Sequence, residues 1–148
     1  MKLSTKVRYS VRLMLELALN YNERHLCLHE AAERQEVSEK YLEHLAAALK
    51  AAGLIRGVRG RHGGYVLARP PSEIRLSEIH HALGGSLAPV ECVDDPAACS
   101  RGKLCVTRDV WTEVRDAMRK VLESTTLQDL VERQYQKLAA KGQEMYYI

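Results

Sequence analysis

The feature that most constrains the fold is a change of hydrophobic period at Gly53. Before it, apolar residues recur at helical spacing in three segments. After it come two short apolar runs, 54–58 and 65–67, on either side of the glycine-rich stretch 59–64. Two short strands around a glycine-rich turn form a β-hairpin. The sequence therefore predicts a mainly α chain with one small β-hairpin.

The three helical segments have identifiable ends. Ser4 can cap the first helix, and a short second helix at about 28–34 leads into a turn at 35–37. Ser38 can cap the third helix, which Gly53 ends where a left-handed residue is favoured. The apolar face of the first helix is predicted at Val7, Val11, Met14, Leu15 and Ala18, and that of the third at Leu42, Leu45 and Leu49.

Helix, turn, helix and hairpin is the order of a winged helix-turn-helix, whose second helix of the pair enters the DNA major groove. Basic and polar residues at the start and on the outer face of the third helix can contact phosphates and base edges. The arginines of the thin hairpin turn suit the minor groove, although a solvated turn is the plainer alternative. The predicted DNA-binding residues are Ser38, Lys40, Tyr41, Glu43, His44, Lys50, Arg59, Gly60 and Arg61.

Three of the four cysteines lie within fourteen residues, at Cys92, Cys99 and Cys105. Three thiolates in a segment with proline and glycine suit a soft metal or an iron–sulfur cluster. Structural zinc favours four ligands with close cysteine pairs, which this segment lacks. The remaining alternatives are a redox-active thiol switch or no ligand at all. Cys27, between two leucines, is predicted to be a packing residue.

After Cys105 the chain becomes helical again. Apolar residues at three- and four-residue steps form a seam that is typical of a helix pairing with a second copy. Thr126 and Asp129 resemble a capping box for a last helix. The predicted dimer contacts are Trp111, Val114, Met118 and Val121. The expected organisation is a DNA-binding domain at 1–85, a cysteine-rich cluster-binding loop at 86–106, and a dimerisation helix with a C-terminal helix at 107–148.

The bulk properties narrow the class. A net charge of +3 over 148 residues permits a nucleic-acid partner without requiring one. Glu16 interrupts the apolar stretch 11–19, so no membrane span is expected, and the N-terminus lacks a signal-peptide pattern. We therefore expect a cytoplasmic protein with reduced cysteines. No nucleophile–base pair, phosphate loop or paired carboxylates indicate an enzyme.

Several of these motifs together resemble the Rrf-type winged-helix regulators, and within them the IscR/NsrR-like iron–sulfur branch. The resemblance rests on 6–11, 37–45, 53–55, the wing 58–68, the three spaced cysteines and Trp111. It implies a homodimer joined through the long helix, a 4Fe-4S or 2Fe-2S cluster on the cysteine loop, and repression controlled by the state of the cluster.

The chain departs from that branch at the fourth ligand. The resemblance implies either a histidine three residues after the last cysteine, where this chain has Arg108, or an acidic residue on the partner's first helix, where it has Arg8. The fourth ligand and the cluster type are therefore left open. A cluster-free regulator responding to a small ligand, a partner protein or thiol oxidation remains an alternative. A metal- or cluster-carrying enzyme or delivery protein is the alternative from another class.

Overall fold

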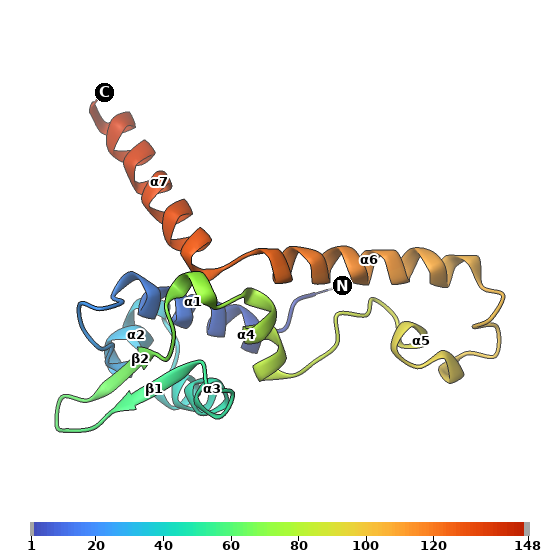
Figure 1. Cartoon of the computed structure of the whole chain (residues 1–148), viewed down its shortest axis with the longest axis horizontal. Coiled ribbons are helices and arrows are strands. Elements are labelled where there is room, and N and C mark those ends of the chain that lie inside the picture. The colour runs from blue at the N-terminus through green and yellow to red at the C-terminus, as the bar shows by residue number, and fades with distance from the viewer. Residues whose placement is uncertain (1, 147–148) are drawn as a thin grey trace.

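The computed structural model describes residues 2–146 and places the wing, the helix-turn-helix and the core in one head (Figure 1). The head begins with α1 (Thr5–Leu19), α2 (Leu28–Gln35) and α3 (Glu39–Ala51). The strands β1 (Ile55–Val58) and β2 (Gly64–Leu67) follow, then a 3₁₀ turn (Pro71–Glu73) and α4 (Leu76–Leu83). The remaining elements are α5 (Glu91–Asp94), a second 3₁₀ turn (Pro96–Ala98), α6 (Val106–Ser124) and α7 (Leu127–Tyr146).

The predicted helix ends are confirmed by their hydrogen bonds. The Ser4 hydroxyl accepts a hydrogen bond from the backbone N–H of Val7, and Ser38 accepts one from Tyr41. Gly53 has a φ of +75°, which a residue without a Cβ adopts at little cost. Thr126 and Asp129 cap the start of α7 reciprocally, at 2.8 and 3.1 Å. The predictions of these helix ends are correct because a helix cap depends on residues that are close in sequence.

The core of the head is built around α1. Leu13, Met14 and Leu17 are buried against residues of α3, α4 and β2, while Val11 and Leu15 are only partly buried at its edge. Leu127 and Val131 of α7 belong to the same core, so the chain returns to the head after α6. Full burial of such aliphatic side chains contributes about 1.5–3 kcal/mol each.

The hairpin pairs β1 with β2 in antiparallel register, with Ile55 opposite Leu67 and Val58 opposite Gly64. A bridge between Leu26 and Tyr65 adds a third short extended segment to it. The predicted hairpin is thus confirmed to within one residue at each strand. The residues between the strands, 59–63, form the turn at the tip of the wing.

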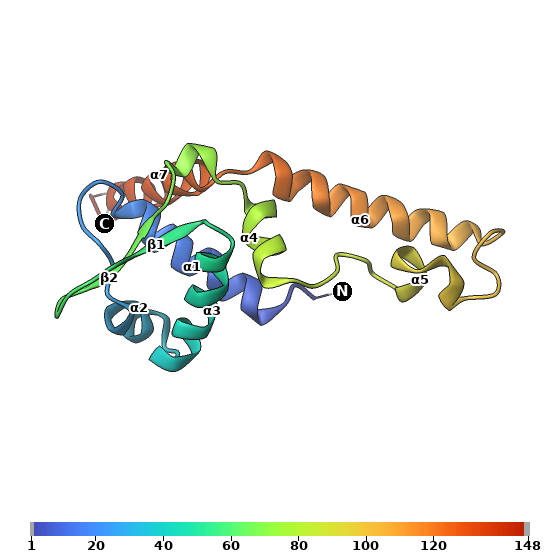
Figure 2. The ribbon, with the colours of Figure 1, turned by 60° about the horizontal axis from the view of Figure 1, so that its bottom comes forward.

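α6 projects away from the head, and the cysteine loop lies at its far end (Figures 1 and 2). At the near end, the backbone N–H of Leu76 donates to the carbonyl of Thr125 at 3.0 Å. Arg75 donates a second bond, of 2.8 Å, to the carbonyl of Glu123. α6 is therefore fixed to the head at one end only. Among residues 2–146, no helix is long and apolar enough to cross a membrane.

Candidate DNA-binding surface and cysteine loop

The turn between α2 and α3 sets the direction of the candidate recognition helix. Glu36 ends α2 in a left-handed conformation with φ 55°, and the N–H of Val37 donates to the carbonyl of Ala32 at 3.1 Å. Ser38 then starts α3 through its bond to Tyr41. The two helices are thereby joined by a tight turn, as a helix-turn-helix requires.

α3 has a buried face and an exposed polar face, as its periodicity predicts. Leu42, Leu45 and Leu49 have no exposed surface and hold the helix against the head. The opposite face leaves side chains free to meet base edges and phosphates. Its exposed residues include Lys40, Glu43, His44, Ala47 and Lys50.

Tyr41 differs from these residues because it is half-buried. Its ring packs edge-to-face on Tyr9 of α1, with ring centroids 5.9 Å apart, and the Arg12 guanidinium lies 5.3 Å from the centroid of Tyr9. Arg12 is exposed, so a cationic group stands beside the start of α3. Sequence reasoning missed Tyr9 and Arg12 because their link to Tyr41 depends on how α1 crosses α3.

The tip of the wing is exposed and basic, and includes Arg59, Gly60 and Arg61. Gly60 has a φ of +124°, and its carbonyl accepts a bond from Gly63 at 3.1 Å. A Cβ on Gly63 would lie 2.3 Å from the carbonyl oxygen of Val58, closer than atoms can approach. The two glycines therefore keep the turn narrow, and a narrow cationic tip fits a narrow minor groove.

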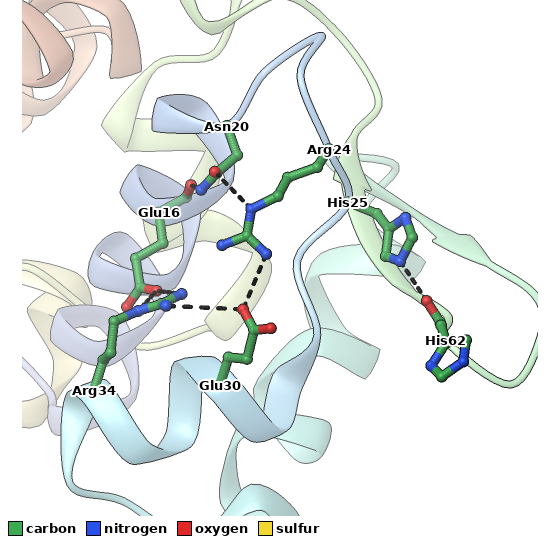
Figure 3. Close-up of polar contacts among 7 residues, drawn as sticks. All are labelled: Glu16, Asn20, Arg24, His25, Glu30, Arg34 and His62. Atoms are coloured by element: carbon green, nitrogen blue, oxygen red, sulfur yellow. Dashed lines mark hydrogen bonds and ion pairs between the residues drawn. The ribbon is translucent and has the colours of Figure 1, made fainter.

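A polar network holds α1 against α2 behind this surface (Figure 3). Glu16 of α1 pairs with Arg34 at 2.8 Å and accepts a bond from the buried Gln35 at 2.8 Å. Glu30 pairs with Arg24 at 3.0 Å, and the hydrogen bond and charge of that guanidinium lower the pKa of Glu30. The network fixes the first helix of the helix-turn-helix on the core.

The three clustered cysteines lie on separate parts of the cysteine loop, residues 86–106. Cys92 is half-buried on α5, Cys99 is exposed after the second 3₁₀ turn, and Cys105 is half-buried at the N-cap of α6. None of them forms a disulfide. Cys27, predicted to be buried, is half-buried instead because it occupies the N-cap of α2, at the end of a loop.

The chemistry around Cys105 favours its thiolate. The Thr107 hydroxyl, 3.1 Å from the sulfur, and the backbone N–H of Arg108 lower the pKa of Cys105. The Arg108 side chain donates to the carbonyl of Cys92 at 2.7 Å. Arg108 stands where the resemblance implies a histidine ligand. Its side chain instead holds the backbone of Cys92 near the start of α6, and a guanidinium offers no lone pair to a metal.

A groove of about 700 Å³ at the end of the loop is lined by Cys99, Cys105 and the basic residues Arg101 and Lys103. Within residues 2–146, no three histidine, cysteine or carboxylate side chains are gathered where they could hold a metal ion. His80 and His81 line a different cavity, between α4 and α6.

The predicted seam of α6 lies on a face that the chain itself covers only in part. Trp111 and Val121 are 36% and 61% exposed, while Val114 and Met118 are half-buried. Val110, which the seam prediction omitted, is 49% exposed on the same side. A groove of about 380 Å³ adjoins this helix, lined by Leu3, Val7, Val11, Leu76 and Leu122 together with Tyr9, Arg8 and Arg12.

A helix-turn-helix with an exposed polar recognition helix and a narrow basic wing defines a winged-helix DNA-binding protein. The chain belongs to the Rrf2 family, described as iron-dependent transcriptional regulators, whose model matches residues 3–133. It is accordingly a DNA-binding transcriptional regulator and not an enzyme.

Individual relatives and structures agree with this assignment. The protein rrf2 of Nitratidesulfovibrio vulgaris Hildenborough is 40% identical over 131 residues, covering 88% of this chain and 87% of that protein. The structure of CymR, the global cysteine regulator of Bacillus subtilis, superimposes with a TM-score of 0.75 at 40% identity, covering 90% and 98% of the two chains. The structure of T. potens IscR gives a TM-score of 0.73 at 40% identity, covering 90% and 88%.

Proposed function

We propose that this regulator acts in the cytoplasm as a homodimer, and that its affinity for an operator depends on whether an iron–sulfur cluster occupies the cysteine loop. The observation that carries the proposal is the set of three unpaired thiols on one loop, at the end of α6 farthest from the DNA-binding head. A family description that includes iron dependence also supports it.

The donor chemistry of the loop fits a cluster. Cys92, Cys99 and Cys105 would hold it, and no fourth ligand is assigned. Ligation requires the loop to draw the thiols together, since they are not gathered in the described part of the chain. Thiolate is the ligand that cluster iron prefers, and Cys105 is already biased toward that form. When bound, an incompletely ligated cluster would supply an iron centre that oxygen or nitric oxide can reach.

The residues of this chain provide a path from the loop to the head. Arg108 holds the carbonyl of Cys92, and Arg115 donates to that of Val93 at 3.4 Å, so α5 is fastened along α6. The other end of α6 is bonded to the head through Arg75 and Leu76. An ordered loop at the far end would therefore restrict how two heads are spaced in a dimer.

A cluster-free regulator of the same family is the second candidate. The dispersed cysteines and the similarity to CymR favour it. In that form the loop would respond to a small ligand, a partner protein or thiol oxidation, and the surface of the head would bind DNA in the same way.

Anaerobic reconstitution of the wild type and four single Cys→Ser variants tests the proposal. The operator is first selected from random duplex DNA, and iron, sulfide and operator affinity are then measured. Cys92→Ser, Cys99→Ser and Cys105→Ser should each lose the cluster and its effect on affinity, while Cys27→Ser should keep both. A wild type that stays free of iron yet binds its operator supports the second candidate. Loss of the cluster only in Cys27→Ser would show that the ligands are misassigned.

A further inference from the structure

Three consecutive residues of the loop between α1 and α2, at 24–26, contact different parts of the head. Figure 3 shows the contacts of Arg24 and His25. Arg24 donates to Asn20, at the C-terminal end of α1, at 3.2 Å and to Glu30 of α2 at 3.0 Å. His25 reaches the tip of the wing, and Leu26 joins the hairpin. This short segment therefore connects the wing to α1 and α2, the two helices that precede the recognition helix α3.

Leu26 makes the backbone part of this connection. It exchanges two hydrogen bonds of 2.9 Å with Tyr65 of β2, and its side chain is fully buried in the core. The backbone of Gly64 approaches so closely that a Cβ there would lie 2.2 Å from the Leu26 carbonyl oxygen. The base of the wing is thus fixed against the head.

His25 makes a separate contact nearer the tip. Its ring nitrogen Nε2 meets the backbone carbonyl of His62. A carbonyl only accepts, so Nε2 carries the hydrogen and donates it. The His62 ring points away from His25 in Figure 3, and both Arg61 and His62 are exposed. The backbone of the turn is therefore held while its side chains stay free.

We infer that His25 is a positioning residue for DNA binding: it fixes the wing turn so that Arg61 and His62 are presented to the minor groove, without itself contacting DNA. The inference rests on the proposed DNA-binding role of the wing. Without the bond from His25, the four-residue strands would hold only the base of the hairpin. The tip would then lose conformational freedom on binding DNA, and this ordering weakens affinity.

The expected loss of operator affinity in His25→Ala follows from the removal of one hydrogen bond. A net contribution of about 0.5–1.5 kcal/mol corresponds to a roughly two- to tenfold loss of operator affinity in His25→Ala. No phosphate contact is removed, so the slope of log affinity against log salt should stay unchanged. Arg61→Ala should instead flatten that slope by about one unit for a lost phosphate contact.

The experiment measures operator affinity over a salt series for the full-length protein. The variants are His25→Ala, His25→Gln, Arg61→Ala and the double variant His25→Ala/Arg61→Ala. The Gln side chain can donate to the same carbonyl, so it should restore most of the affinity. His81→Ala, an exposed histidine on α4, is the matched control and should bind like the wild type. The hydrogen-exchange rate of the backbone amides of 59–64 should rise in His25→Ala. It should stay near the wild-type rate in His25→Gln and in the control variant.

The double variant separates positioning from a general loss of stability. If His25 acts through Arg61, its effect on affinity should shrink once Arg61 is absent, whereas independent effects add. The inference is overturned if His25→Ala binds like the wild type, if its salt slope falls as that of Arg61→Ala does, or if the two losses add fully. If Arg61→Ala itself has no effect, the proposed role of the wing fails as well.

Discussion

Arg59 and His44 would contact DNA in two different ways. Arg59, on the wing, offers a charge that any phosphate can accept, whereas His44, on the exposed face of α3, is placed to read base edges. Charge contacts raise affinity for every sequence, while base contacts distinguish one sequence from another. The two substitutions should therefore change different measurements.

We expect Arg59→Ala to weaken binding to specific and random DNA alike, and to flatten the log–log salt dependence by about one unit. His44→Ala should narrow the difference in affinity between the operator and a duplex with altered bases, and leave the slope unchanged. Fluorescence titrations over a salt series, with Arg133→Ala on α7 as the control, measure both. If His44→Ala lost the same amount of affinity for every DNA sequence, His44 would have no role in base recognition.

At the scale of elements, α4 depends on one carboxylate at its start. Glu78 accepts a bond from the backbone N–H of Arg75 at 2.9 Å and pairs with Arg69 at 2.6 Å. Burial raises the pKa of Glu78, but the Arg75 N–H and the Arg69 guanidinium outweigh it, and the pKa falls below 4.5. A lowered carboxyl pKa stabilises the fold above the unfolded-state value and stops doing so as pH falls through the folded-state value.

Glu78→Gln should accordingly lower the free energy of unfolding at pH 7 by about 1 kcal/mol, the usual size of a helix cap. The gap between variant and wild type should close as pH falls below 4.5, the ordinary pKa of the group. Urea denaturation at a fixed protein concentration, repeated from pH 7 downward, measures this. Glu73→Gln, at a neighbouring exposed position, serves as the control. A gap that persists at acid pH would contradict the electrostatic origin.

The elements that the sequence predicted well are those specified locally. Ser38, Gly53 and Thr126 mark helix ends through contacts within a few residues, and the two strands follow from the glycine-rich turn between them. The outward face of α3 could also be predicted, because its period alone determines which side is apolar.

Contacts between distant segments could not be predicted in this way. His25 and His62 are 37 residues apart, and the Tyr9–Tyr41 pair depends on the crossing of two helices. The cysteine loop follows the head in sequence, yet it lies at the far end of α6, because α6 runs back toward the head. The short helix α5 within that loop also lacks a clear periodic signal, since one turn is too short to show one.

At the scale of the whole molecule, a single chain leaves α6 with no buried residue, although its apolar side chains share one face. Val110, Trp111 and Val121 are exposed there, and the apolar groove at the start of α1 lies beside the same helix. Covering this face with a second copy would contribute about 25 cal/mol per Å² of apolar surface, before the cost of association. The two recognition helices would then meet successive major grooves, about 34 Å apart.

We therefore expect a dimer at micromolar concentration and a loss of dimer in Val121→Glu, because the new carboxylate would be buried without a partner. Operator affinity should fall in Val121→Glu as the dimer is lost, since a single head contacts only half of a two-fold site. Lys120→Glu changes the exposed residue just before Val121, which points about 100° away around α6. It makes a larger change of charge and should leave the dimer intact. Sedimentation velocity with circular dichroism separates dissociation from unfolding. A monomeric wild type, or a Val121→Glu variant that remains dimeric, would exclude this face of α6 as the interface.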